Sequence, residues 1–387
     1  MYRIGKEELE AIGKVFETRA LFKINNAGQD AMHAEEELKE KIGAKHAIIM
    51  TSGHAALASA LIAMGIGPGD QVIVPGYTYI STALAVVCAG AIPVIVDVDE
   101  SLTLDPAAFE AAITPNTKAV MPVHIKGFPS KMDEICKIAK EHGILVLEDA
   151  CQADGGSYHG KRLGTIGDTG AFSFNYYKII TAGEGGALVT NNKKFFENAL
   201  IYHDSGAVAY FGDQLKDVDT QLFCGSEYRT NGVSCAILRE QLKRLDGILE
   251  DLRRNKKYVM DALKGVCEFA PSNDIEGDCG TTISFTFKTE EEALKFNEYI
   301  GGVRPIDTGK HVYNRWTPIM EKRGALHPLM DPFKMPANQG IIPDYSDDMC
   351  KKTLDILSRN VYREVNPEWT VADMDALIEK VKAYFIK

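Results

Sequence analysis

The chain has 387 residues, of which 45% are hydrophobic and 25% are charged, a composition typical of a folded globular protein rather than a disordered or fibrous one. At about 150 residues per domain, this length predicts two or three domains. The 43 Lys and Arg residues against 54 Asp and Glu residues give a net charge of -11, and no stretch concentrates basic residues, so the sequence argues against nucleic acid as a partner.

Short apolar runs alternate with helix-like stretches from residue 46 to about residue 190. The predicted strands are 46–50, 71–74, 92–96, 118–123, 144–148, 170–174 and 186–190, and the predicted helices between them are 55–64, 81–89, 105–113 and 131–142. Near-continuous apolar strands that alternate with helices indicate an α/β fold with a mainly parallel sheet flanked by helices on both faces. Ligands of such sheets bind at the carboxyl ends of the strands.

The pattern changes after about Arg229. Residues 233–266 have apolar side chains at spacings of three and four and predict one long helix that bridges two domains. The remaining predicted elements are a strand at 281–288, helices at 291–300 and 373–385, and a long ordered loop, rich in Pro and Gly, at 322–344. We therefore predict a large domain with an N-terminal arm over residues 1–250 and a smaller C-terminal α+β domain over residues 251–387.

The cysteines and histidines show no pattern of a disulfide framework or a metal site. The eight cysteines are scattered without a C-x-x-C pair, and the nine histidines form no ligand pair at helical spacing. We therefore expect reduced thiols and no bound metal. The amino terminus lacks the apolar core of a secretory signal, and no run approaches the roughly 18 apolar residues that a membrane span needs. These features indicate a cytoplasmic protein.

Two predicted strands end in residues suited to binding a ligand. Ser52, Gly53 and His54 follow the first strand and open an Ala-rich helix, and a turn of small residues at a helix N-terminus exposes backbone N–H groups that suit a phosphate. Asp149 ends the apolar run ILVLED, where its carboxylate needs a cationic partner to stay ionised. Each pattern also fits a simple N-cap of a helix or turn, and both interpretations stay open at this point.

A third segment, AFSFNYYKIITAGEGG, places Ser173 and Lys178 after another predicted strand. Lys178 stands between apolar and aromatic residues, unlike a solvated surface lysine. Desolvation favours the free amine that a Schiff base requires. A structural lysine that reaches solvent from a packed strand end is the alternative interpretation.

These three segments, in this order and spacing, resemble the sugar aminotransferases of the DegT/DnrJ/EryC1/StrS family, which bind pyridoxal 5'-phosphate (PLP) on the type I PLP-transferase fold. The resemblance begins near Phe22 and covers most of the chain, including TSGHAAL, PGDQVIVPGYTYISTA, VLEDACQADGG, AFSFNYYK, TAGEGG and SRNVYREVNPEWT. The spacing from Asp149 to Lys178 is the family's own. The resemblance implies PLP as the cofactor, pyridoxamine 5'-phosphate as its intermediate form, and a homodimer with shared active sites.

The resemblance also implies roles for individual residues. Lys178 would form the internal aldimine with PLP and act as the catalytic base, and Asp149 would keep the pyridine nitrogen protonated. Tyr79 would stack on the ring, and Gln152 would lie near the ring hydroxyl. The residues placed around the phosphate are Ser52, Gly53, His54 and Ser173.

Three positions depart from the family pattern. His54 stands where the family commonly has Thr, and Cys151 stands where it has Ala. Glu227 stands where it has an Asn that reaches the phosphate of the partner subunit. Since a carboxylate would repel a phosphate, we expect Glu227 to turn toward the acceptor substrate or toward a cation such as Arg229.

The stretch HVYNRW has polar and aromatic groups suited to a hydroxylated substrate. A loop that merely packs on the face of the site explains this stretch equally well. The candidate substrate residues are Glu227, Arg229, His311, Tyr313 and Arg315.

The resemblance implies a PLP-dependent aminotransferase that moves an amino group from glutamate or glutamine to a keto-sugar, keto-sugar acid or keto-cyclitol in amino-sugar biosynthesis. One alternative is a PLP-dependent sugar dehydratase of the same family, in which His replaces the Schiff-base lysine. Another is a non-catalytic effector-binding protein on this fold. Lys178 argues against the dehydratase, and Lys178, Asp149 and Ser173 together argue against the non-catalytic protein. A nicotinamide dehydrogenase and a serine hydrolase are disfavoured because the chain has no G-x-G-x-x-G after the first strand and no G-x-S-x-G.

Overall fold

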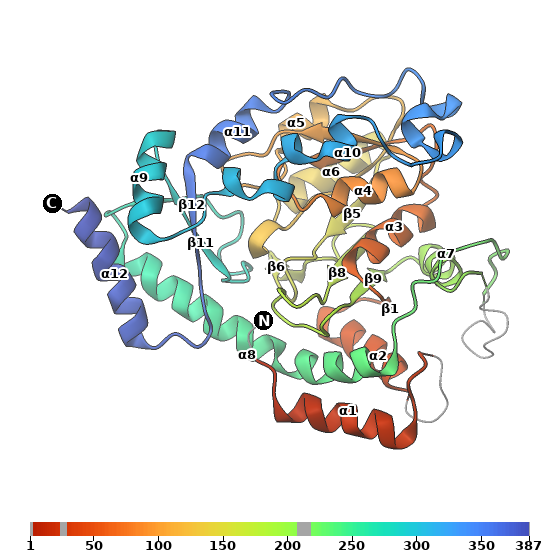
Figure 1. The fold of residues 1–387 in the computed structure, drawn as a ribbon, viewed down its shortest axis with the longest axis horizontal. Helices are drawn as coiled ribbons and strands as arrows, with labels where there is room; N and C mark the ends of the chain where they lie inside the picture. Colours follow the sequence, from red (N-terminus) through yellow and green to blue (C-terminus); the bar gives the residue numbers. More distant parts are fainter. Residues whose placement is uncertain (1–2, 24–28, 207–217, 387) are drawn as a thin grey trace.

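The computed structural model describes residues 3–23, 29–206 and 218–386. Its centre is a seven-stranded sheet in the order β1-β9-β8-β5-β4-β2-β3 (Figure 1). The strands are β1 (His46–Met50), β2 (Gln71–Pro75), β3 (Ile92–Val96), β4 (Thr117–Val120), β5 (Leu145–Asp149), β8 (Thr169–Ser173) and β9 (Gly186–Thr190). All paired neighbours are parallel except that β9 is antiparallel to both β1 and β8. The predicted mainly parallel α/β sheet is confirmed.

Each face of this sheet has its own hydrophobic core. The helices on one face are α2 (Asp30–Ile42), α5 (Pro106–Ala111), α6 (Met132–His142) and α8 (Gly232–Ala262), and those on the other are α3 (Gly53–Ala63), α4 (Ser81–Cys88) and α7 (Lys193–His203). Ile49 and Val146 pack in the first core, whereas Ile48 and Leu147, one residue away, pack in the second. Because both faces are covered, the strands are apolar along nearly their whole length.

Helix α8 connects the large sheet with a smaller one (Figure 1). It packs against α1 (Lys6–Thr18) and α2, and also against α12 (Val371–Phe385) and β11. The smaller sheet is antiparallel, with β11 (Thr282–Thr286) between β10 (Glu268–Phe269) and β12 (Asn360–Glu364), and α9 (Glu290–Ile300) packs on β12. The long helix, the strand and the two helices predicted here are confirmed. The domain boundary at residue 250 falls within α8 and stays a prediction.

The chain between α9 and α11 (Lys351–Ser358) returns to the large sheet. Its elements are short: η4 (Pro305–Asp307), η5 (Gly309–His311), η6 (Tyr313–Arg315), α10 (Thr317–Met320), η7 (Pro328–Met330), η8 (Pro332–Lys334) and η9 (Pro336–Asn338). Trp316, Phe333 and Tyr345 are buried in the same core as α3 and α4. The predicted loop at 322–344 is therefore packed on the large sheet.

Several elements were not predicted from the sequence. They are α1, α2, α7, α10, α11, β6 (Ser157–Tyr158), β7 (Lys161–Arg162), β10 and β12. Helix α2 illustrates the reason, because its buried positions include Ala31 and Ala34 beside Leu38 and Ile42, which gives a weak apolar pattern. Among the described residues, no helix combines the length and the apolar character needed to cross a membrane.

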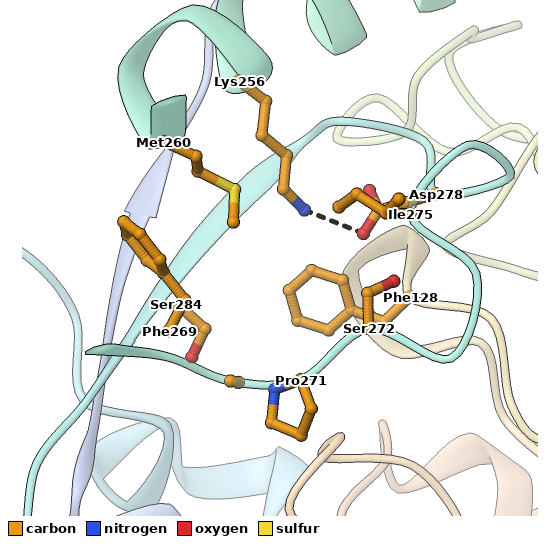
Figure 2. A pocket seen from close by; sticks show the side chains of 10 residues that line it. Phe128, Lys256, Met260, Phe269, Pro271, Ser272, Ile275, Asp278 and Ser284 are labelled. Atoms are coloured by element: carbon orange, nitrogen blue, oxygen red, sulfur yellow. Dashed lines mark hydrogen bonds and ion pairs between the residues drawn. The ribbon is translucent and has the colours of Figure 1, made fainter. Parts of the chain in front are cut away.

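A buried ion pair lies where α8 meets the smaller sheet (Figure 2). Lys256 Nζ is 2.7 Å from Asp278 Oδ2, and the two side chains are 8% and 1% exposed. The ammonium also lies 4.8 Å from the centre of the Phe128 ring, which follows η1 (Ile125–Gly127). If one partner of such a pair is removed, the other charge stays buried in a low-dielectric interior without a counter-charge.

We predict that Asp278→Ala lowers the free energy of unfolding by about 3–5 kcal/mol, because the Lys256 ammonium would stay buried without its partner. The midpoint of thermal unfolding measures the loss. The control combines Asp278→Ala with Lys256→Met, which removes both charges and should recover most of the stability. A single variant as stable as the wild type would show that this pair does not hold the junction.

Candidate active site

The carboxyl ends of β1, β5 and β8 meet at one edge of the large sheet, since these strands run in the same direction. Gly53 opens α3 at this edge. A Cβ atom built on Gly53 would lie 2.8 Å from Ser173 Cβ, at the end of β8, and 2.8 Å from Cys151 Sγ, just after β5. The first turn of α3 therefore packs directly against both strand ends, and it requires glycine because any side chain would overlap its neighbours.

Asp149, the last residue of β5, is a buried carboxylate with a donor on each oxygen. It is 5% exposed. The Thr82 hydroxyl donates to Oδ2 at 2.8 Å, and the Cys151 backbone N–H donates to Oδ1 at 3.1 Å. The Thr82 hydroxyl also lies 2.7 Å from the Thr78 hydroxyl. These contacts hold the carboxylate in one orientation at the strand end, so Asp149 caps a turn and also faces the edge where ligands bind.

Glu148, one residue earlier, points to the opposite face of the sheet. Its buried carboxylate accepts hydrogen bonds from the backbone N–H groups of Gly164, Ile166 and Gly167. His124 Nε2 is a further donor at 3.1 Å, because its Nδ1 accepts from the Ser130 backbone N–H. Glu148 is thus fully occupied in holding a loop, and Asp149 is the carboxylate available at the edge.

Lys178 is half-buried in the turn that follows β8. Its backbone N–H donates to the Asn175 carbonyl at 2.9 Å. Within residues 3–23, 29–206 and 218–386, its ammonium forms no hydrogen bond or ion pair. Burial raises the pKa of the Cys151 thiol and of the Asp154 carboxyl well above their usual values, and the charge of Lys178 opposes both shifts. Because β8 is the parallel neighbour of β5, the turn that carries Lys178 begins at the same sheet edge as Asp149.

The N-terminus of α3 has the features of an anion site as well as a cap. The Ser52 hydroxyl accepts from the Ala55 backbone N–H at 3.1 Å, which confirms the N-cap interpretation. As the first two residues of α3, Gly53 and His54 have backbone N–H groups without an intrahelical partner. Gly186 allows β9 to pass beside this turn, because a Cβ atom there would lie 2.3 Å from the Ser52 carbonyl carbon. Burial lowers the pKa of the half-buried His54, which is therefore neutral.

His311 and Tyr79 are brought together by pairing between distant segments. The backbone N–H groups of Thr78 and Ile80 donate to the carbonyls of His311 and Lys310, each at 3.0 Å. The Tyr79 and His311 rings lie 5.5 Å apart, and Lys310 Nζ lies 4.9 Å from the centre of the Tyr79 ring. Burial, with the cations Lys126, Lys178 and Lys310, lowers the pKa of His311 to about 4. A neutral imidazole thus faces the same edge as Lys178.

Gln152 also lies beside this edge, in the turn after β5. Its Oε1 atom accepts from the Lys126 backbone N–H at 3.0 Å. This bond leaves the amide NH₂ of Gln152 as the group free to donate to a ligand.

Two candidate substrate residues are not brought to the site. Tyr313 is fully buried in the core with α3 and α4; its hydroxyl donates to the Asp347 carbonyl at 2.7 Å and accepts from the Cys350 backbone N–H at 3.2 Å. A hydroxyl with both bonds made inside the core cannot bind a sugar, so we withdraw the predicted substrate role of Tyr313. Arg315 is exposed, and nothing in the structure supports its role.

Glu227 and Arg229 lie in a segment that runs beside the end of β1. The Thr51 backbone N–H donates to the Tyr228 carbonyl at 3.0 Å, which places this segment next to the turn at Ser52. Arg229 pairs with the buried Asp204, and its guanidinium lies 2.8 Å from the Glu227 carboxylate. The expectation that Glu227 turns toward Arg229 is confirmed.

Sequence reasoning missed two residues of this region. Thr82, on α4, orients Asp149, at the end of β5. The sequence gives no signal that this helix and this strand are in contact. Asp154 is buried in the turn after β5, whereas an acidic residue in a Gly-rich turn is typical of a solvated surface. The buried ion pair of Figure 2 involves neither residue.

The chain is similar to known proteins over most of its length. The DegT/DnrJ/EryC1/StrS aminotransferase family matches residues 3–322. GDP-perosamine synthase of Caulobacter vibrioides is 42% identical over 227 residues, which are 58% of this chain and 59% of that protein. L-glutamine:2-deoxy-scyllo-inosose aminotransferase of Streptoalloteichus tenebrarius is 38% identical over 271 residues, which are 69% of this chain and 62% of that protein. The chain thus matches less than two thirds of the length of either relative.

A solved structure extends the likeness to the whole fold. The crystal structure of 3-amino-5-hydroxybenzoic acid synthase is 28% identical and superposes on 99% of this chain and 97% of its own, with a TM-score of 0.79. The predicted type I PLP-transferase fold is confirmed.

We predict that the stability of the protein falls as the pH drops from about 6.5 to about 4, and that His311→Asn reduces this fall. The folded state holds His311 neutral down to a pKa of about 4, against an ordinary value of 6.5, so in this window the unfolded state binds more protons. Thermal unfolding midpoints across the window measure the effect. The exposed His142 provides the control, since His142→Asn should follow the wild type. Identical pH profiles for His311→Asn and the wild type would contradict the burial of a neutral imidazole.

Proposed function

The chain belongs to the DegT/DnrJ/EryC1/StrS aminotransferase family, whose enzymes use PLP, and from this membership we propose that it is a PLP-dependent aminotransferase. Its reaction moves an amino group from glutamate or glutamine to a keto-sugar, keto-sugar acid or keto-cyclitol. The single observation that carries the proposal is the placement of Asp149 and Lys178 at one sheet edge, beside the N-terminus of α3.

The residues at this edge fit PLP in three respects. The oriented carboxylate of Asp149 suits the ring nitrogen, and the Lys178 amine suits the aldehyde. The glycine-lined first turn of α3, which has no acidic residue, suits the phosphate. In this proposal Ser52, Gly53, His54 and Ser173 bind the phosphate, Tyr79 stacks on the ring, and Gln152 meets the ring hydroxyl.

When bound, PLP supplies an electron sink that stabilises negative charge on a substrate carbon. Lys178 Nζ would take a proton from the substrate carbon and hold it. Asp149 would hold the ring nitrogen protonated, and Thr82 keeps the Asp149 carboxylate in place. Because one site would serve the amino donor and then the acceptor, the kinetics should be ping-pong.

The substrate class follows from the relatives and from the polar groups near Lys178. One relative is named for a GDP-linked amino sugar, and another for glutamine and a deoxy-inosose, a cyclitol. The first name gives an aminated sugar as the product and the second gives a hydroxylated carbonyl acceptor, which supports the keto-sugar and keto-cyclitol class. Neutral His311 provides a hydrogen-bonding group for acceptor hydroxyls, while Glu227 and Arg229 lie beside the Ser52 turn.

We further infer a cytoplasmic homodimer. Large apolar side chains are exposed on α1 and beside Lys178, with Leu9, Phe16 and Tyr177 at 69%, 61% and 82%. Such exposure supports a subunit interface close to the site. The eight cysteines are all unpaired, which supports a reducing compartment.

The first test is amine transfer itself. We predict that purified protein carries PLP with visible absorbance, that glutamate or glutamine removes this absorbance, and that leucine does not, since the acceptor side of the site is polar. Lys178→Ala should lose turnover, because the proposed attachment point of PLP is removed. The surface variant Lys243→Ala is the control and should react like the wild type. Retained transamination in Lys178→Ala would overturn the assignment, and an equal response to leucine and glutamate would indicate a general amino acid aminotransferase.

The second test concerns the ring nitrogen. We predict that Asp149→Asn lowers the rate of amine transfer at least roughly 100-fold, because one fixed electrostatic partner of the transition state is lost. Single-turnover absorbance changes measure this rate, and titration with PLP measures cofactor affinity. Thr82→Val, which removes one hydrogen bond but keeps the charge, should lose much less. Near-normal rates in Asp149→Asn with intact PLP binding would show that another residue holds the nitrogen.

A further inference from the structure

Lys126 is a half-buried lysine at the carboxyl edge of the large sheet, inside η1, which follows β4. Val123, three residues earlier, pairs with Asp149 at the end of the neighbouring β5. The Lys126 backbone N–H donates to Gln152 Oε1 at 3.0 Å. Because β4 lies between β5 and β2 in the parallel part of the sheet, Lys126 stands between the turn of Gln152 and the turn of Tyr79.

The backbone of Lys126 is held in a conformation that favours glycine. Its φ is +51°, and a side chain in this left-handed region costs free energy. Its carbonyl accepts a hydrogen bond from the Thr281 hydroxyl, just before β11. Its ammonium lies 3.1 Å from Glu364 Oε1, but the Glu364 side chain is 73% exposed, and exposed pairs add little stability. A lysine kept at this cost, with only a solvated partner, indicates that its ammonium serves a ligand.

Lys310 brings a second ammonium to this edge from a distant segment of the chain. Its carbonyl accepts from the Ile80 backbone N–H at 3.0 Å and from Nε1–H of the buried Trp316 at 2.9 Å. Its ammonium lies 4.9 Å from the centre of the Tyr79 ring. Within the parts of the chain that the structure describes, this ammonium forms no hydrogen bond or ion pair. Two hydrogen bonds and an aromatic ring thus hold the cation beside Tyr79.

His311 adds a neutral hydrogen-bonding group next to these cations. Its Nδ1–H donates to the Thr308 carbonyl at 3.4 Å, so Nε2 is the ring atom left to accept a hydrogen bond. The His311 and Tyr79 rings lie 5.5 Å apart. Burial and the charges of three lysines, Lys126 and Lys310 among them, lower the pKa of His311 to about 4. The edge therefore offers two cations and one acceptor, which together suit a molecule with an acidic group and hydroxyl groups.

We propose that Lys126 and Lys310 form a cationic subsite that binds an acidic group of the acceptor, a carboxylate or a phosphate, while His311 accepts a hydrogen bond from an acceptor hydroxyl. This inference rests on the proposed function and narrows its substrate class, because a neutral keto-cyclitol has no acidic group to meet the two lysines. A sugar acid supplies the charge through a carboxylate, and a nucleotide-linked sugar supplies it through a diphosphate. Lys126 exchanges Glu364 for the ligand at little cost, since that pair is exposed to solvent.

The experiment measures the binding of acidic and neutral sugars to the purified, PLP-loaded protein by calorimetric titration. The acidic probes are glucuronate, which carries a carboxylate, and GDP-mannose, which carries a diphosphate; their neutral counterparts are glucose and mannose. We expect at least one acidic probe to bind about tenfold or more tightly than its neutral counterpart, the effect of hydrogen bonds to a charged group. The tighter acidic probe identifies the source of the charge. Equal binding of acidic and neutral probes, or no binding of either acidic probe, would overturn the proposal.

Methionine variants test the two lysines, because Met keeps the length of the side chain and removes the charge. Lys126→Met and Lys310→Met should each weaken binding of the acidic probe about tenfold. Glu364→Gln, which removes the competing carboxylate, should strengthen that binding. A lysine variant that binds the acidic probe like the wild type would overturn the place of that lysine in the subsite, and no gain in Glu364→Gln would overturn the exchange at Lys126.

Lys322 provides a matched control at the other edge of the sheet. It also has a positive φ, of +52°, and its ammonium lies 5.7 Å from the centre of the Tyr345 ring. The Tyr345 hydroxyl donates to the Pro93 carbonyl at 2.7 Å, near the amino end of β3, which is parallel to β2. Lys322→Met should therefore bind every probe like the wild type. An equal loss in all three lysine variants would overturn the specific subsite.

The donor half-reaction separates this subsite from the proposed function. The loss of PLP absorbance with glutamine measures it, and Lys310→Met should impair it less than the binding of the acidic probe, because the side chain of glutamine carries an uncharged amide. An equal loss would assign Lys310 to the donor and overturn the proposal. Protein that reacts with glutamine but does not prefer acidic probes would overturn the subsite alone. Wild-type protein that carries no PLP and reacts with neither glutamine nor glutamate would instead overturn the proposed function.

Discussion

The alternation of side chains along β5 is the constraint on which the site depends. Glu148 and Asp149 are adjacent, so a strand must send them to opposite faces. Three backbone N–H groups and His124 fix Glu148 on its side. Asp149 is thereby held on the side of α3 and α4, where Thr82 donates to it. A slip of β5 by one residue would exchange the two carboxylates and bury both without donors, which is why this edge of the sheet admits one register.

The large sheet was predictable because both of its faces are buried. Its strands are then uninterrupted apolar runs, and β1, β3 and β9 begin and end at the predicted residues. The return of the chain between α9 and α11 to the large sheet was not predictable. That return depends on Trp316, Phe333 and Tyr345, which pack in the same core as α3 and α4. A local pattern in a Pro- and Gly-rich stretch does not indicate which distant helices the stretch will contact.

The sequence predicted candidate residues where one residue type suits the chemistry, but it did not predict their hydrogen-bond partners. Sequence alone singled out Asp149 and Lys178, because a carboxylate at a strand end and a lysine among aromatic residues are uncommon. The substrate role predicted for Tyr313 was wrong, because the sequence does not show the hydrogen-bond partners of its hydroxyl. Its phenol suits a sugar, but the Asp347 carbonyl and the Cys350 N–H already occupy it. Thr82 was not predicted, because it orients Asp149 through a contact between α4 and β5 that the sequence does not indicate.

Asp149 and Asp154 show how two carboxylates close together in the chain acquire different roles. Asp149 has two donors, which orient its carboxylate at the end of β5. Asp154 has no hydrogen-bond donor among the described residues, and burial raises the pKa of its carboxyl well above the usual value. The missing donors around Asp154 therefore cost free energy of folding that Asp149 does not cost. Because both side chains are almost fully buried, the difference between them comes from the hydrogen-bond donors and not from burial.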